Sequence, residues 1–119
     1  MLFRSLVILK MDAGTERMHR RVDLPLDEDF DLDRVTDAMA DMDNVTVQTC
    51  FLQGRIDNTT DEEVDAWVDR IDRIQPASVQ IYSLDRQPPA PGLTQVPRGD
   101  LEAIAERCRQ RTGVPVEVY

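Results

Sequence analysis

Short apolar segments alternate with longer amphipathic segments along this 119-residue chain. The apolar segments predict strands, and the segments with apolar residues at helical spacing predict helices. The predicted strands are Leu6–Lys10, Val45–Leu52, Val79–Leu84 and Val116–Tyr119, and the predicted helices are Leu32–Met42, Asp61–Ile74 and Leu101–Arg111. Because each link between strands is long enough for a crossover, this order predicts a parallel α/β sheet. Two architectures stay open, an open doubly wound sheet and an arc of a βα-barrel.

Local signals mark the ends of the predicted helices. Thr60 and Glu63 fit a capping box, with Thr60 as the N-cap of the second helix. Gly113 and Pro115 end the third helix. The apolar faces are formed by Leu32, Val35, Met39 and Met42, by Val64, Trp67, Val68, Ile71 and Ile74, and by Leu101, Ile104, Ala105 and Cys108.

Four aspartates alternate before and at the start of the first helix: Asp27, Asp29, Asp31 and Asp33. This spacing resembles the opening of a calcium loop. Such a loop requires glycine where this chain has Leu32, and a bidentate glutamate where it has Ala38. We therefore expect these aspartates to cap the helix, where the helix dipole favours negative charge.

Charge and hydropathy restrict the class of protein. The net charge is −9, from 23 acidic and 14 basic residues, and Lys10 is the only lysine. An acid-rich surface of this kind is typical of halophilic proteins and repels nucleic acid unless the arginines cluster. No apolar run reaches the roughly 20 residues of a membrane span, and the first residues do not form a signal peptide. The composition predicts a single cytoplasmic domain without membrane contact.

Polar side chains interrupt the predicted strands at alternate positions. Lys10 and Asp12 share a face at the end of the first strand, as do Gln48 and Cys50 in the second and Gln80 and Tyr82 in the third. A buried glutamine needs several hydrogen-bond partners, so two of them favour a polar interior such as a barrel lumen. Alternatively, each glutamine lies near a strand end and meets water or a loop carbonyl.

Asp85 and Arg86 follow the third strand directly, at the carboxyl end where parallel sheets build their sites. We expect them to form an ion pair that supports the loop, or to lie near a substrate. Cys50 and Cys108 lack the spacing of a metal motif, and a disulfide is not expected in the cytoplasm. Cys108 is expected in the core, and His19 at the surface.

Three segments occur in a distinctive order: Leu9–Gly14, Gln48–Gly54 and Val79–Arg86. Together they resemble the second half of a radical S-adenosylmethionine protein, of the iron–sulfur oxidoreductases related to the wyosine-forming tRNA enzymes. The resemblance runs from about Leu6 to Tyr119. It implies a partial barrel of six βα repeats, of which this chain holds the fourth to the sixth strands.

The resemblance also implies the chemistry of a parent enzyme. A [4Fe-4S] cluster on a Cys-x-x-x-Cys-x-x-Cys loop would reductively cleave S-adenosylmethionine to a 5′-deoxyadenosyl radical. This chain has no three-cysteine motif. The resemblance therefore implies a fragment that is inactive alone, binds neither cofactor stably, and has the missing N-terminal half of the barrel as its partner.

Residue roles follow from the same resemblance. Lys10 and Asp12 end the strand that reaches the ribose or carboxylate of the cofactor. Gln48 points into the lumen from the strand that packs against the adenine. Gln80 and Tyr82 lie on the strand whose backbone meets the adenine edge. Asp85 and Arg86 would stand at the barrel mouth.

Met1–Ser5 is an awkward entry into a buried strand and is interpreted as a non-native leader, so the domain is taken as residues 6–119. Continuous genomic DNA upstream of Leu6 that encodes something other than a cluster-binding half would contradict this interpretation. Two other functions remain: a complete small α/β binding module without catalysis, and a fragment of another βα-barrel enzyme such as an aldolase. The substrate is a tRNA or a small molecule, between which the residues do not decide.

Overall fold

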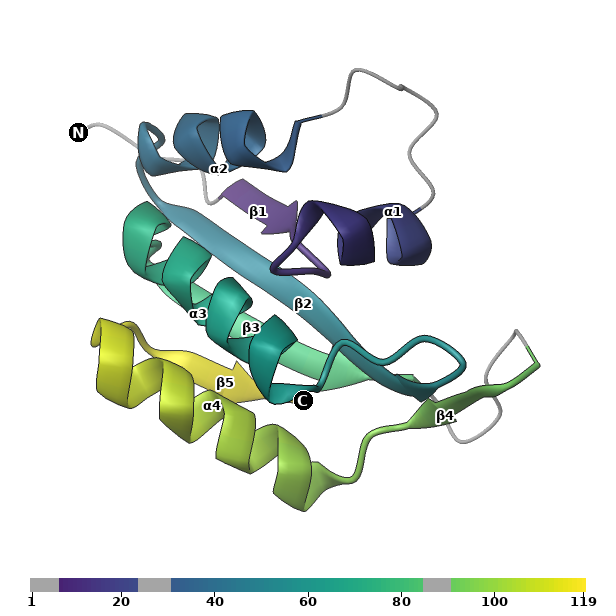
Figure 1. Cartoon of the computed structure of the whole chain (residues 1–119). Coiled ribbons are helices and arrows are strands. Elements are labelled where there is room, and N and C mark those ends of the chain that lie inside the picture. The colour runs from purple at the N-terminus through teal and green to yellow at the C-terminus, as the bar shows by residue number, and fades with distance from the viewer. Residues whose placement is uncertain (1–6, 24–30, 85–90) are drawn as a thin grey trace.

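Four parallel strands form the central sheet of the protein. The structure is a computed structural model that describes residues 7–23, 31–84 and 91–119. Within these ranges the parallel strands lie side by side in chain order, and a fifth strand runs antiparallel to the end of β2 (Figure 1). The parallel strands are β1 (Val7–Lys10), β2 (Val45–Gly54), β3 (Ser78–Ser83) and β5 (Val116–Val118), and the antiparallel strand is β4 (Leu93–Gln95).

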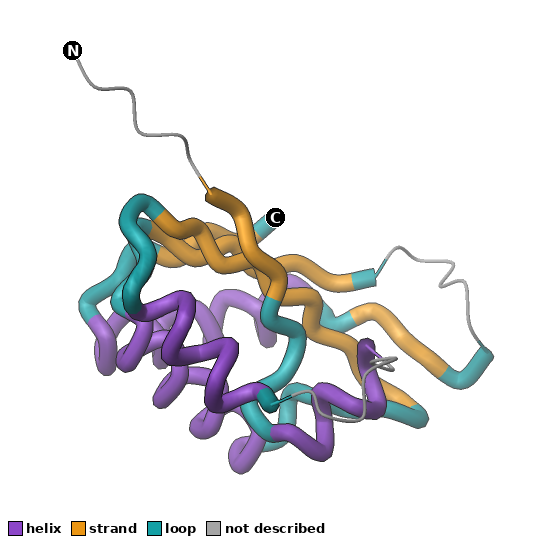
Figure 2. The backbone as a smooth tube through the Cα atoms, turned by 90° about the horizontal axis from the view of Figure 1, so that it is seen from above, coloured by secondary structure: helices purple, strands orange, loops and turns teal. Residues whose placement is uncertain are grey.

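The helices lie together on one face of this sheet, as the view from above shows (Figure 2). They are α1 (Glu16–Asp23), α2 (Leu32–Ala40), α3 (Asp61–Ile74) and α4 (Arg98–Thr112). Parallel strands joined in chain order by right-handed crossovers place every crossover helix on the same side. A doubly wound sheet reverses its strand order and carries helices on both faces. The described residues therefore form a singly wound α/β layer, and the doubly wound alternative does not apply to them.

The predicted elements are found with shifted ends. The helix predicted at Asp61–Ile74 is confirmed without change, whereas β2 continues to Gly54 and α4 starts at Arg98. The helix predicted at Leu32–Met42 is α2, which ends at Ala40, and Met42, predicted on its buried face, is 44% exposed. The prediction for Met42 was wrong because the helix ends before the residue can turn toward the sheet.

Two elements were not predicted. Helix α1 has only eight residues, of which two, Met18 and Val22, are apolar, and so gives too short a pattern to predict a helix. His19 of this helix is only 9% exposed, so its predicted surface position was wrong. Strand β4 has three residues and follows a Pro- and Gly-rich stretch that favours a loop. A hydrogen bond of 2.8 Å from Arg55 N to Gly92 O lies next to the pairing of β2 with β4. Gly54, at the end of β2, has a φ of 103°, a conformation that favours glycine.

The core lies between the sheet and the helices. Phe51 of β2 meets Trp67 of α3 edge to face, with ring centroids 5.2 Å apart. Trp67 Nε1 donates to Thr49 Oγ1 at 2.9 Å, which satisfies the one polar atom of the indole. Cys108 is fully buried in this core, as predicted, and neither cysteine forms a disulfide.

Side-chain caps fix the helix starts. Thr60 Oγ1 accepts from Glu63 N at 3.3 Å, which confirms Thr60 as the N-cap of α3. Asp31 accepts from Asp33 N and Arg34 N and so caps α2 as expected, whereas Asp27 and Asp29 lie outside the described residues. Gly113 ends α4 in the left-handed conformation, with a φ of 73°.

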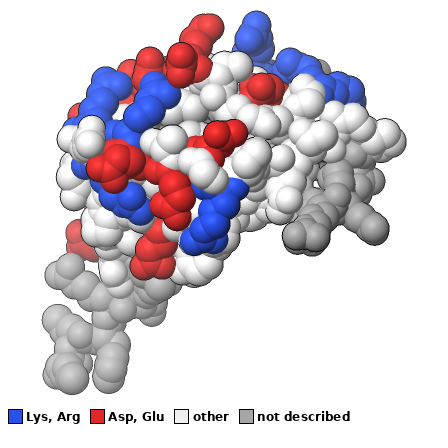
Figure 3. All heavy atoms as spheres, turned by 90° about the horizontal axis from the view of Figure 1, so that it is seen from below, with Lys and Arg blue, Asp and Glu red and all other residues white. Residues whose placement is uncertain are grey.

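Arginine–aspartate pairs join the exposed sides of the helices. Arg107 of α4 pairs with Asp61 and Asp65 of α3, and Arg111 pairs with Asp69. Acidic and basic side chains are interleaved over this side of the molecule, seen from below (Figure 3). Exposed pairs of this kind each contribute about 0–1 kcal/mol to stability. No helix in the described ranges is long and apolar enough to cross a membrane.

Candidate ligand-binding face of the sheet

The face of the sheet opposite the helices carries the polar residues that the sequence singled out. Alternate residues of a strand point to opposite faces, so Val47, Thr49 and Phe51 face the helices while Gln48 and Cys50 face away. Strand register places Lys10 beside Gln48 and Gln48 beside Gln80, with Tyr82 beside Cys50. We call this surface the open face: it includes Lys10, Asp12, Gln48, Cys50, Gln80 and Tyr82, together with Ile8, Thr46, Ser78 and Glu117.

The two glutamines bond to each other in the middle of the open face. Gln48 Nε2 donates to Gln80 Oε1 at 2.9 Å, and both side chains are half-buried. One step toward the start of the strands, the hydroxyls of Thr46 and Ser78 share a hydrogen bond of 2.9 Å. This bond uses the amide nitrogen of Gln48 and the amide oxygen of Gln80, so the Gln48 oxygen and the Gln80 amino group keep hydrogen-bonding capacity for a ligand. The glutamines lie within their strands rather than at the ends, so the strand-end alternative was wrong.

Lys10 stands beside this pair as the cation of the open face. Its Nζ lies 3.5 Å from Asp12 Oδ2 and 6.0 Å from the centre of the Tyr82 ring. A hydrogen bond with Tyr82 and the charge of Asp12 raise the pKa of the Lys10 amine above its usual value. The amine is therefore held protonated, and its side chain is 59% exposed and can reach an anionic group.

Asp12 is buried and has a structural role besides its contact with Lys10. Its Oδ1 accepts from Cys50 N at 2.9 Å, where β2 extends past the end of β1. The Asp12 carboxylate thus takes the place of the backbone carbonyl that a longer β1 would offer to Cys50 N. The strand register places Lys10, Gln48, Gln80 and Tyr82 on one face, and Asp12 lies beside Lys10. Their roles toward a cofactor stay a prediction.

Asn58 is a buried residue near this site that the sequence analysis missed. Its Nδ2 donates to Asp12 O at 3.0 Å and to Cys50 O at 2.9 Å, and its Oδ1 accepts from Leu52 N at 2.8 Å. One amide side chain therefore ties the carboxyl ends of β1 and β2 together. Its position in a polar run just before the Thr60 cap gave it the appearance of an ordinary loop residue.

The loop after β1 is anchored to α3. Thr15 Oγ1 donates to the two carboxylate oxygens of Glu63 at 2.9 and 3.1 Å, and Arg70 Nε donates to Gly14 O at 2.6 Å. Glu63 thus holds a distant loop with its carboxylate, in addition to its place at the third position of the cap. A Cβ on Gly14 would lie 2.2 Å from Trp67 N, so only glycine permits this approach.

The remaining candidates carry less information. Asp85 and Arg86 lie outside the described residues. Cys50 and Cys108 are both buried, but they lie on opposite sides of the sheet. Cys50 is on the open face, and Cys108 is on α4, which covers the opposite face. Across residues 7–23, 31–84 and 91–119, no three His, Cys, Asp or Glu side chains are grouped so that they could hold a metal ion.

Comparison with known proteins adds no relative. No family model, curated protein or solved structure matches this chain.

Proposed function

We propose that this chain is the C-terminal half of a radical S-adenosylmethionine barrel and that its open face lines the lumen. The observation that carries the proposal is the combination of parallel strands in chain order, helices on one face and a polar row on the other. In a βα-barrel the helices form the outer ring and the opposite face of the sheet points inward. A polar inner face suits a barrel that holds a polar cofactor rather than one filled with apolar side chains.

The unpaired edges of the sheet favour the proposal that a second half of the barrel pairs with this chain. In the part of the chain that the structure describes, β1 pairs with β2 alone and β5 with β3 alone. Ile8 on the outer strand is 50% exposed. An apolar edge strand is a liability that complete domains cover. The N-terminal half of the barrel is the partner that would continue the sheet at β1.

The donors and acceptors of the open face fit S-adenosylmethionine. Lys10 would hold the carboxylate and Asp12 would fix Lys10. The amide oxygen of Gln48 and the amino group of Gln80 would meet the ribose or adenine, with Tyr82 beside the ring. The cysteines do not fit the cluster, because a [4Fe-4S] cluster needs several cysteine ligands at one place and these two lie on opposite sides of the sheet. The cluster would be held by the other half, and this chain alone would be inactive. The substrate of the assembled enzyme is a tRNA or a small molecule.

The test is a nuclear magnetic resonance titration of this chain with S-adenosylmethionine. We expect weak binding whose shifts centre on the open face. The double variant Gln48→Leu/Gln80→Leu should weaken it about ten-fold, since two hydrogen-bonding groups are lost. Gln110→Leu is the matched control, because Gln110 is exposed on α4 and bonds only to Glu106 in the described structure. Shifts elsewhere, or equal affinity in all three proteins, would contradict the proposal.

A second experiment tests the partner. The chain is assembled with the cluster-bearing half of a radical S-adenosylmethionine protein and reconstituted with iron, sulfide and a reductant. Release of 5′-deoxyadenosine that depends on both halves supports the proposal. A chain that stays a stable monomer, recruits no second half and binds no S-adenosylmethionine would instead favour a complete binding module.

A further inference from the structure

The open face carries opposite charges at its two edges. Strand register aligns Lys10 of β1, Gln48 of β2, Gln80 of β3 and Glu117 of β5 in one row across the sheet. Lys10 and Glu117 are the only charged residues within these four strands. Three strand spacings of about 4.8 Å put them roughly 14 Å apart, which is too far for a contact within one chain. The row is therefore positive at one end and negative at the other.

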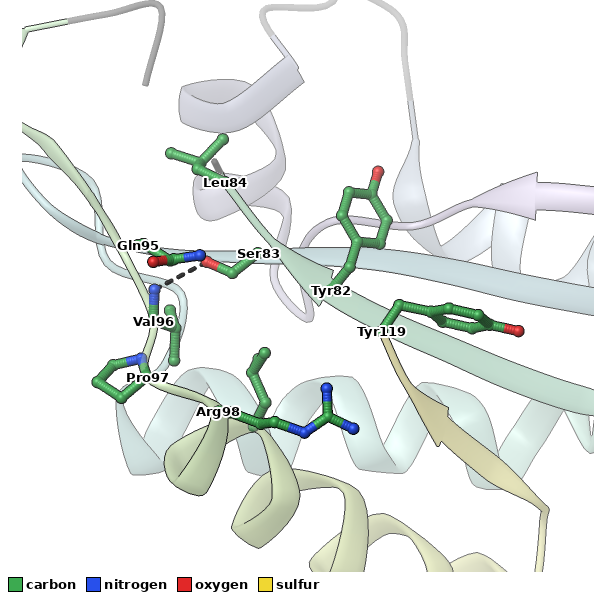
Figure 4. Close-up of a pocket in the computed structure, with 9 residues that line it drawn as sticks. Tyr82, Ser83, Leu84, Gln95, Val96, Pro97, Arg98 and Tyr119 are labelled. Carbon is green, nitrogen blue, oxygen red and sulfur yellow. Dashed lines mark hydrogen bonds between the residues drawn. The ribbon is translucent and has the colours of Figure 1, made fainter. Parts of the chain in front are cut away.

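Exposed apolar side chains accompany these two charges. Of the three large hydrophobic residues that are exposed in the described ranges, two lie on this face: Ile8, which is 50% exposed, and Tyr119, which is 63% exposed. Ile8 lies two residues before Lys10 and Tyr119 two residues after Glu117, so each shares the face of its charged neighbour. The side chains of Tyr82 and Tyr119 are directed away from α4 (Figure 4). Tyrosine is enriched where two proteins meet.

The order of the charges makes this face complementary to itself. A two-fold axis parallel to the strands, between β2 and β3, lays β1 of one copy over β5 of the other. Lys10 then meets Glu117 of the second copy, and the symmetry makes this contact twice. An axis perpendicular to the strands would instead lay Lys10 on Lys10, where like charges repel. Sheets that pack face to face lie about 10 Å apart with strands within about 30°, which leaves room for these side chains.

We propose that the open face binds a second copy of this chain, so that two sheets pack face to face with their helices outside. The face is four strands wide, and its longest strand, β2, has ten residues. At about 4.8 Å per strand and about 3.3 Å per residue, two such faces bury on the order of 1,000 Å² together. Specific interfaces bury about 1,200–2,000 Å². We therefore expect a weak dimer, with a Kd of about 10–100 μM.

This inference goes beyond the proposed function and does not rest on it. It concerns the chain on its own, whereas the proposed function concerns the chain joined to the other half of a barrel. In that barrel the same face lines the lumen, so the other half would have to displace the second copy.

The test is sedimentation analysis of the chain from about 1 to 500 μM, where the wild-type protein should pass from monomer to dimer. Lys10→Glu and Glu117→Lys should each weaken association about 100-fold, because two symmetric attractions become repulsions that cost roughly ten-fold each. An equimolar mixture of the two variants should form a heterodimer with close to the wild-type affinity. In that mixture every contact between residues 10 and 117 joins opposite charges again, which also shows that both variants are folded.

Arg111→Glu is the matched control, because it makes the same change of charge on the helix side, where Arg111 pairs with Asp69. It should leave the dimer unchanged, and an equal loss there would show general charge repulsion and overturn the proposal. A wild-type chain that stays monomeric at the highest concentration, or a mixture that does not associate, would also overturn it. Binding of S-adenosylmethionine is measured separately, on protein dilute enough to be monomeric, so failure of either proposal leaves the other standing.

Discussion

The two faces of β2 show how one strand serves two different tasks. On the helix side, Val45, Val47 and Phe51 are buried among the side chains of α3 and its neighbours. On the open face, Thr46 and Gln48 alternate with them and pair with polar partners on β3. The apolar face excludes water and supplies the driving force for folding. The open face contributes little to that force, so its residues can be polar and can meet a ligand.

The first prediction compares two positions of β2 that lie three residues apart and point to opposite faces of the sheet. Phe51→Ala should lower the free energy of unfolding by about 3–5 kcal/mol, because it removes a buried ring and leaves a cavity beside Trp67. Gln48→Ala should cost about 1 kcal/mol or less, the net contribution of one half-buried hydrogen bond. Urea unfolding followed by Trp67 fluorescence measures both. Similar losses would mean that the open face is as important for folding as the core.

The second prediction concerns the contact between the β1 loop and α3. Gly14→Ala should destabilise the protein by about 3 kcal/mol, since the new methyl group would overlap the backbone at Trp67 and Ala66, which cannot rotate away. Gly99→Ala is the control. A Cβ there has no atom within 4 Å, and alanine in a helix should raise stability by about 0.5–1 kcal/mol. Thermal unfolding of both variants decides, and a neutral Gly14→Ala would show that the loop is not packed against α3.

The third prediction tests how the covered face affects ionisation. Burial raises the pKa of the Cys108 thiol from 9.0 to about 11. The folded protein then keeps a proton that the unfolded chain releases, so the contribution of this thiol to stability should be constant below pH 9 and fall between pH 9 and about 11. The loss should be about 2–3 kcal/mol relative to Cys108→Ala, whose stability lacks this dependence. Urea unfolding from pH 8 to 11 measures the difference, and parallel curves for the two proteins would show that the thiol is accessible to water.

The sequence predicts the covered face better than it predicts the site. Helix α3 and the strands could be found because burial imposes a strict spacing on Val64, Trp67, Val68 and Ile71. Lys10, Gln48 and Gln80 could be found for the opposite reason, as polar residues at positions where a strand should be apolar. In both cases the signal is local, because strand alternation fixes the face of each side chain.

Features that depend on distant contacts could not be found in this way. Asn58 is buried because it bonds to Asp12 and Cys50, and neither contact leaves a pattern around residue 58. His19 is buried although it belongs to an eight-residue helix with only two apolar residues. The cleft lined by Ser83, Gln95 and Arg98 lies where β3, β4 and α4 meet, and their approach depends on the turn through β4. A periodic pattern reports on one element and its neighbours, not on where separate elements meet.

The smallest expected effect is on the open face, where partners rather than burial shift an ionisation. Lys10 has a raised pKa mainly through its hydrogen bond with Tyr82 and secondly through Asp12. Stability from this contact is present below the usual pKa of 10.5 and is lost as the pH rises through the raised value. Because the side chain is largely exposed, the contribution should be only a few tenths of a kcal/mol.

Lys10 is the only lysine, so one resonance reports its titration directly. Tyr82→Phe should move that pKa toward 10.5 and Arg73→Gln, on the helix side, should not; an unchanged pKa in Tyr82→Phe would mean that Asp12 alone holds the amine.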